Sequence, residues 1–143
     1  LKRLVAEHPL ESDLYETVLQ NCHVLPPGIL YYRRLSNPTK ESIPFTENLL
    51  RSVAEHHNIS HLVWDLRGRQ MVQNGLHKTI VQRINGLYPR IQEISVVVDE
   101  HNLQMRLTLK FGVRLSRLLQ NPIHYSVHVN MESVLTLIQR QIC

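Results

Sequence analysis

The chain has 143 residues, of which 43% are hydrophobic and 20% charged, and its formal net charge at neutral pH is +4. A chain of this length forms one domain, here expected over residues 1–143, and buries a core without disulfides or a structural metal. No apolar run approaches the roughly 18 residues that a membrane-spanning helix needs, which excludes a transmembrane segment.

The first ten residues include several charged side chains and a proline, and therefore lack the apolar stretch of a secretory signal. The two cysteines, Cys22 and Cys143, lie far apart in the sequence, which argues against a structural disulfide. On these grounds we expect a cytoplasmic protein. Its modest positive charge favours an acidic partner.

A β-hairpin is the first element predicted along the chain. Residues 14–19 and 29–35 are typical of extended segments, and they flank Pro26-Pro27-Gly28. The two prolines fix φ, and the glycine permits the chain to reverse its direction.

A helix is predicted next, over residues 45–57, because apolar residues recur there at helical spacing. Pro44 or Thr46 is expected to begin this helix, and Asn58 to end it. Residues 61–66 are short and rich in β-forming side chains, which predicts a strand.

A polar loop with two glycines follows this strand and opens a second helix, which Asn74 is expected to cap. The apolar stripe of this helix consists of Leu76, Ile80, Ile84 and Leu87, and Pro89 ends it. Junctions between a strand and a helix commonly hold the ligand site of small α/β domains. The loop is therefore the first place to look for a site.

Residues 94–98 form a continuous apolar run, which is typical of a central strand covered on both faces. After Asn102 a third helix is predicted, which Pro122 closes. The apolar stripe expected to face the core consists of Leu103, Leu107, Phe111, Leu115 and Leu118.

Residues 124–129 alternate polar and apolar side chains, which predicts a strand with one face in water. Asn130 is expected to cap a last helix whose apolar positions are Met131, Val134, Leu135 and Ile138. A hairpin followed by alternating helices and strands predicts a single-domain α/β fold. Its sheet should be mixed and mostly parallel, with an N-terminal hairpin and four helices.

This element order resembles that of the STAS domains, the family of anti-sigma factor antagonists and sulphate-transporter tails. The resemblance rests on Asp65-Leu66-Arg67-Gly68, on the apolar pair Met71-Val72, and on Asn74-Gly75-Leu76 at a helix start. The segment from Phe111 to the last helix is similar to the STAS-like subgroup. The resemblance implies a regulatory module that binds a protein partner.

Phosphorylated members of that family carry a serine at the start of this helix, where backbone N–H groups and the helix dipole favour a phosphate. This chain has Asn74 at the matching position, which cannot be phosphorylated. The resemblance therefore implies that the serine switch is lost while the binding surface remains.

Binding is expected at the loop, together with the start of the third helix. The residues concerned are Arg67, Arg69, Gln70, Gln73, Asn74, Gly75 and Arg106. Arginines in such a loop would make charge-assisted hydrogen bonds to an acidic protein partner, a small anionic ligand or a lipid. The segment carries no nucleophile motif and no phosphate cradle, so we expect neither enzyme activity nor a cofactor.

A basic stripe on the third helix leaves a further interpretation open. It consists of Arg106, Lys110, Arg114 and Arg117. Such a face suits anionic lipid, although a solvated face is the simpler interpretation. The absence of aromatic residues interleaved with the cations argues against nucleic acid.

Acidic and histidine residues suggest two other kinds of site. Asp65 and Asp99 follow adjacent predicted strands and would suit a small enzyme or a phosphoacceptor, although capping and loop hydrogen bonds explain them more simply.

His56, His57 and His61 lie close in the sequence, with Glu55 nearby. The neighbouring histidines point in different directions on a helix, so no metal site is predicted.

Overall fold

The computed structural model describes residues 22–25, 28–33, 42–68 and 82–142. Its five strands form one sheet in the order β1-β2-β3-β4-β5. They are β1 (Cys22–Leu25), β2 (Ile29–Arg33), β3 (His61–Asp65), β4 (Glu93–Val97) and β5 (His124–His128). β1 and β2 pair antiparallel, and every other neighbouring pair is parallel. The expected single-domain α/β fold with a mixed, mostly parallel sheet is confirmed.

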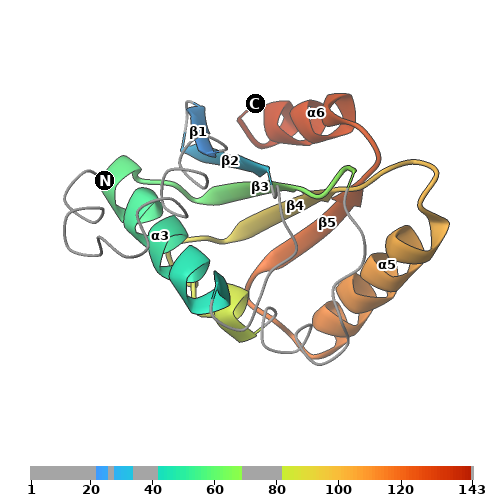
Figure 1. Cartoon of the computed structure of the whole chain (residues 1–143), viewed down its shortest axis with the longest axis horizontal. Coiled ribbons are helices and arrows are strands. Elements are labelled where there is room, and N and C mark those ends of the chain that lie inside the picture. The colour runs from blue at the N-terminus through green and yellow to red at the C-terminus, as the bar shows by residue number, and fades with distance from the viewer. Residues whose placement is uncertain (1–21, 26–27, 34–41, 69–81, 143) are drawn as a thin grey trace.

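Three helices are described in full: α3 (Ser42–His57), α5 (Leu103–Leu118) and α6 (Met131–Ile142). Residues 82–85 are also helical. Successive parallel strands step in one direction across the sheet, so right-handed crossovers place the connecting helices on one face. Figure 1 shows α3 and α5 on that face and α6 on the opposite one. None of the helices in the described ranges is both long and apolar enough to cross a bilayer.

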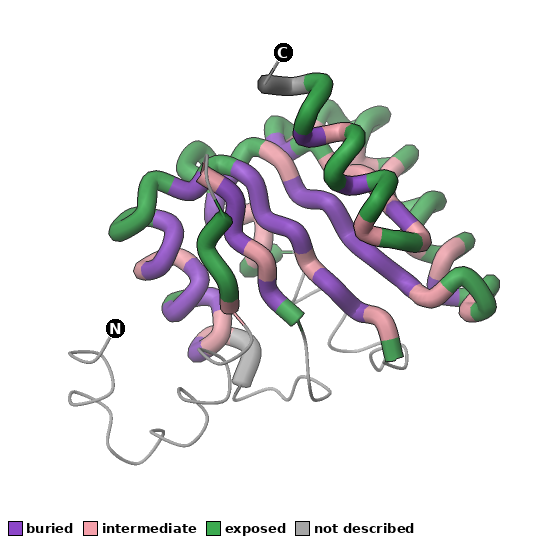
Figure 2. Tube along the Cα trace, turned by 90° about the horizontal axis from the view of Figure 1, so that it is seen from above, coloured by how far each residue is buried: buried purple, intermediate pink, exposed green. Residues whose placement is uncertain are grey.

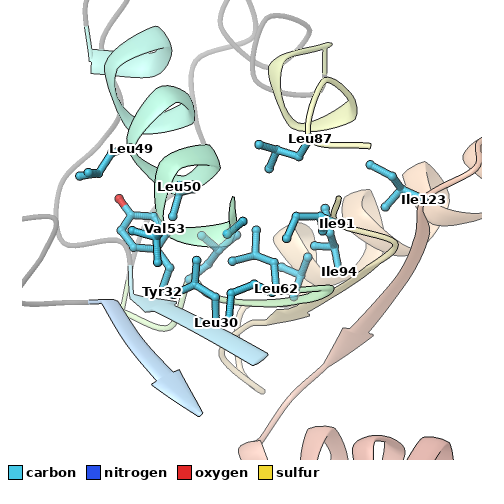
Figure 3. Packing of buried hydrophobic residues seen from close by; sticks show 14 of the residues in the cluster. Leu30, Tyr32, Leu49, Leu50, Val53, Leu62, Leu87, Ile91, Ile94 and Ile123 are labelled. Carbon is cyan, nitrogen blue, oxygen red and sulfur yellow. The ribbon is translucent and has the colours of Figure 1, made fainter. Parts of the chain in front are cut away.

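The main core lies between the sheet and α3. Alternate strand residues point to opposite faces, and Leu30, Leu62 and Ile94 point to this one, where they are fully buried. They pack against Leu49 and Val53 of α3 (Figure 3). Burying a side chain of this size contributes about 1.5–3 kcal/mol, so this layer supplies much of the stability.

A second, smaller core lies on the opposite face, beneath α6. Ile29, Val63 and Val97 come from three neighbouring strands and pack against Val134 and Ile138 of α6. Figure 2 shows how burial is concentrated along the strands between these two layers. β4 is covered on both faces, as the continuous apolar run predicted.

The first elements differ from the prediction in their bounds. The first strand is Cys22–Leu25, whereas the expected strand over residues 14–19 lies outside the described residues. Gly28 follows with a φ of 78°, and a Cβ there would meet the Asn58 carbonyl oxygen at 3.1 Å. The turn therefore requires glycine for both its conformation and its space.

Helix α3 begins at Ser42, earlier than the sequence predicted, with Pro44 in its first turn. Proline is tolerated there because the first N–H groups of a helix have no helical acceptor. The predicted end is confirmed. Asn58 adopts a φ of 57°, and the Ile59 N–H donates to the Ala54 carbonyl at 2.9 Å, as in a left-handed helix terminus.

The prediction for α5 was right about its start, but the helix ends at Leu118, before Pro122. The prediction was also wrong about which stripe faces the core. Met105 is the buried residue of the helix, and Leu109 packs against the core beside it. Leu107 and Phe111, predicted to point inward, are exposed. Leu87, Ile91 and Ile123 are buried in the same core cluster as Met105.

Candidate functional site

A buried carboxylate lies at the carboxyl end of β3, where the sequence predicted a site. The Asp65 side chain is fully buried. Its Oδ1 accepts hydrogen bonds from the Arg67 backbone N–H and from Arg67 Nε, both at 3.0 Å. Its Oδ2 accepts from Arg67 Nη2 at 2.8 Å and from the Tyr31 hydroxyl. Both carboxylate oxygens are thus held by the protein itself.

Asp65 and Arg67 both stay charged near neutral pH. Burial alone would raise the pKa of the Asp65 carboxyl, but hydrogen bonds from Arg67 and Tyr31 outweigh burial and hold its pKa below the ordinary value. Hydrogen bonding to Asp65 raises the pKa of the Arg67 guanidinium. Burial, together with the bond to Asp65, raises the pKa of the Tyr31 hydroxyl.

The loop after β3 is tied to the loop after β4. The Gly68 N–H donates to Asp99 Oδ2 at 2.6 Å, and Gly68 has a φ of 78°. The structure therefore brings Asp65 and Asp99 to the same edge of the sheet, as expected for neighbouring parallel strands. One binds an arginine and the other a backbone N–H, so both fix loop geometry.

Two of the predicted binding residues lie in the described part of the chain. Arg67 is partly exposed, with 37% of its side chain accessible, but its guanidinium is paired with Asp65. Arg106 donates through Nη1 to the Glu100 carbonyl at 3.4 Å. The other predicted residues, which are Arg69, Gln70, Gln73, Asn74 and Gly75, lie outside the described residues.

A row of hydrogen-bonded polar side chains crosses the sheet beneath α6. His61 Nε2 lies 2.8 Å from Ser95 Oγ, which lies 3.3 Å from Ser126 Oγ. Ser126 Oγ lies 2.8 Å from His128 Nε2, and His128 Nδ1 lies 2.7 Å from Ser133 Oγ on α6. We call these five residues the His-Ser chain.

The strand register explains the His-Ser chain. Ser95 and Ser126 are direct partners across β4 and β5, and His128 follows Ser126 by two residues on the same face. Residues 124–129 were predicted to have a wet face, and this is wrong for His128, which is buried. Burial lowers the pKa of its imidazole. Alternation alone could not reveal that α6 covers this face.

His128 is satisfied within the His-Ser chain, which suits a structural role. Both ring nitrogens of His128 face serine hydroxyls, and the five residues include no carboxylate to orient a histidine as a base. The nearest comparable pair, Glu93 and His124, lies 3.3 Å apart at the partly exposed amino end of the sheet. A signal was available in the sequence, because Ser95 is the one polar residue in the run over residues 94–98, which is described above as continuously apolar.

The histidine group suggested by the sequence is not brought together. His56 and His57 are exposed, and their rings meet edge to face with centroids 4.9 Å apart, whereas His61 belongs to the His-Ser chain. Within the ranges that the structure describes, no three histidine, cysteine or acidic residues are grouped closely enough to hold a metal ion.

The side of α5 away from the sheet is turned toward solvent. Its exposed apolar residues are Leu103, Leu107, Phe111, Leu115, Leu118 and Leu119. Phe111 is 70% exposed and Leu118 is 80% exposed. We call these six residues the outer face of α5. Contiguous apolar surface of this kind on a protein commonly marks an interaction site.

Four cations border this outer face. They are Arg106, Lys110, Arg114 and Arg117, and α5 contains no acidic residue. Each cation precedes an apolar residue of the outer face by one position, which places it about 100° round the helix. The predicted basic stripe therefore lies beside an exposed apolar surface and not opposite a buried one.

Comparison of the chain with protein-family models, curated proteins and solved structures gave no match in any of the three. What can be said of function therefore rests on the geometry of this molecule.

Proposed function

We propose that this protein is a non-catalytic regulatory module of the cytoplasm that docks a partner through the outer face of α5. The observation that carries the proposal is the exposure of six large apolar side chains, five on α5 and Leu119 directly after it. Side chains of this kind are buried in most folded domains. A helix that turns them outward gains stability when a partner covers them.

The polar groups at the sheet edge support a binding role over catalysis. Asp65 is fully buried, and Arg67 and Tyr31 occupy both of its oxygens. A phosphoacceptor or catalytic acid has to meet its substrate, so the alternative built on Asp65 finds no support there. Asp99 is partly exposed, but it holds the Gly68 N–H, which suits a loop anchor.

A STAS-like relationship is part of the proposal. The element order and the mostly parallel sheet with its antiparallel first pair support it. So does the Asp65-Leu66-Arg67-Gly68 turn at the carboxyl end of β3. Because Asn74 replaces the serine of phosphorylated STAS domains, regulation in this protein would depend on docking and not on phosphorylation of that loop.

The loop after β3 is retained as a secondary contact. Arg69, Gln70, Gln73, Asn74 and Gly75 remain predictions. Arg67 would contribute less than the sequence suggested, because its guanidinium already neutralises Asp65. An acidic partner would still find cations close to the outer face of α5, on the helix itself.

Site-specific photo-crosslinking tests the docking surface. A photoreactive phenylalanine analogue is placed at position 111 on α5 or, as a control, at Leu135, which is 49% exposed on α6. We expect adducts in native extract, to protein or lipid, from position 111 and markedly fewer from position 135. Equal or absent adducts at both positions would reject α5 as the docking surface.

A further inference from the structure

The outer face of α5 is free because the helix is fixed to the sheet by a different side. Met105 is buried, and Leu109 packs against the main core. These two residues are four positions apart and so lie on one side of the helix. Leu107 and Phe111 follow them by two positions each, which turns them about 200° away. The residues that hold α5 in place are therefore not those that it exposes.

The apolar row runs along the whole helix. It extends from Leu103 at the first position to Leu118 at the last and continues to Leu119. A helix of 16 residues is about 24 Å long. The row therefore forms a long convex ridge, a shape that suits a bilayer surface. A groove on a protein would also accept such a ridge, and the charges on α5 favour the bilayer.

The charges on α5 have one sign. Lys110, Arg114 and Arg117 are exposed, Arg106 is partly buried, and no aspartate or glutamate occurs in the helix. Lysine and arginine carry long apolar stems, so they can lie along a membrane surface with their charges among the headgroups. A face with large aliphatic residues, one phenylalanine and bordering cations is typical of helices that lie in an anionic interface.

The geometry points to an anionic membrane surface as the partner of the outer face of α5. Leu107, Phe111 and Leu118 would enter the boundary between headgroups and acyl chains, while Lys110, Arg114 and Arg117 bind lipid phosphates and carboxylates. This inference rests on the proposed docking function and specifies its partner. Both the apolar row and the cations are required, because neither alone gives stable binding at physiological ionic strength.

Vesicle flotation with the full chain tests the inference. Vesicles of phosphatidylcholine alone are compared with vesicles that also contain about 30 mol% phosphatidylserine, whose negative surface attracts lysine and arginine. We expect the protein to float with the anionic vesicles and not with the neutral ones. Raising salt to about 0.5 M should release it, because salt screens the attraction.

Two variants separate the apolar and cationic contributions, and each has a matched control. Phe111→Glu should abolish flotation, whereas Leu135→Glu on α6 should not. The double variant Lys110→Gln and Arg114→Gln should lower the partition coefficient on the order of ten-fold or more, whereas Arg140→Gln on α6 should leave it within about two-fold. All five substituted positions are exposed, and circular dichroism checks that each of the four variants is folded.

Several outcomes would overturn the membrane assignment. These are no flotation of the unaltered protein with anionic vesicles, equal binding to neutral vesicles, and full retention by folded Phe111→Glu. Crosslinking from position 111 to protein but not to lipid would also reject the membrane while leaving the docking function intact. Absence of any adduct at position 111 would reject both.

Discussion

Arg67 binds the carboxylate of Asp65, two residues earlier in the chain, through three separate donors. Its backbone N–H and Nε reach Oδ1, and its Nη2 reaches Oδ2 at 2.8 Å. The fork of the guanidinium matches the two oxygens of the carboxylate. The turn that leaves β3 is therefore closed by its own ion pair, with the carboxylate buried and the guanidinium at the surface.

Removal of Arg67 should destabilise the fold. In Arg67→Ala the buried carboxylate keeps the Tyr31 bond but loses its cation, and we expect a loss of about 2–3 kcal/mol in the free energy of unfolding. This loss is smaller than the roughly 3–5 kcal/mol for fully buried pairs, because water reaches the partly exposed side of the site. Urea denaturation measures the effect.

The double variant Asp65→Asn with Arg67→Ala provides the control. Since the neutral amide no longer needs a cation, the double variant should be more stable than the sum of the single losses implies. Strict additivity, or a loss below about 0.5 kcal/mol for Arg67→Ala, would contradict the account of a mutually dependent pair.

Much of the fold could be predicted from the sequence, because hydrophobic periodicity and turn residues are local signals. The strand at β4 followed from its continuous apolar run, and the end of α3 followed from Asn58. The start of α5 followed from Asn102 and the periodic leucines. The start of α3 could not be placed, because Ser42 and Pro44 are both acceptable in a first helical turn.

The site was harder to predict, because it depends on what covers each face. Periodicity identified the leucine stripe of α5 correctly as one face, but Met105 and Leu109 on another side anchor the helix to the core. Likewise, the alternation of polar and apolar residues along β5 could not distinguish a face exposed to solvent from a face covered by α6. Tyr31 was missed because its contact with Asp65 spans 34 residues, and no local pattern reports such a distance.

Stability should fall in mildly acidic solution because of His128. Burial lowers the pKa of this imidazole in the folded state below the value of about 6.5 that it has when unfolded. Above that pH the imidazole is uncharged in both the folded and the unfolded state. Its contribution to the free energy of unfolding is then fully present. As the pH falls below about 6.5 the unfolded state binds the proton first, so the free energy of unfolding decreases until the folded pKa is reached.

Urea denaturation between pH 7.5 and pH 5 tests this dependence. His128→Gln removes the titrating group and should flatten the slope, although it also weakens the bonds to Ser126 and Ser133 at every pH. His56→Gln, at an exposed position, should keep the slope of the unaltered protein. An unchanged slope in His128→Gln would show that another group governs the acid response.

Asn130 should contribute to the stability of α6 as its N-cap. Its Oδ1 accepts the Ser133 backbone N–H at 2.8 Å, which satisfies one of the free donors of the first turn. We expect Asn130→Ala to cost about 1 kcal/mol. Asn48→Ala, at an exposed position inside α3, is the matched control and should be neutral or slightly stabilising, because alanine favours helix. Equal effects of the two variants in thermal denaturation would argue against the cap.

Cys22 should react slowly with alkylating reagents in the folded protein. Burial raises the pKa of its thiol from 9.0 to about 12, and the thiolate is the reactive form. At pH 8 the folded protein would therefore hold roughly a thousand-fold less thiolate at this position than the unfolded chain.

Iodoacetamide labelling, followed on the peptide that contains Cys22, should be at least about a hundred-fold slower in native buffer than in denaturant. The rate should rise as pH increases toward 12 while the fold persists. Equal rates in the two solvents would mean that Cys22 is mostly accessible to solvent in the folded protein, and would contradict its burial.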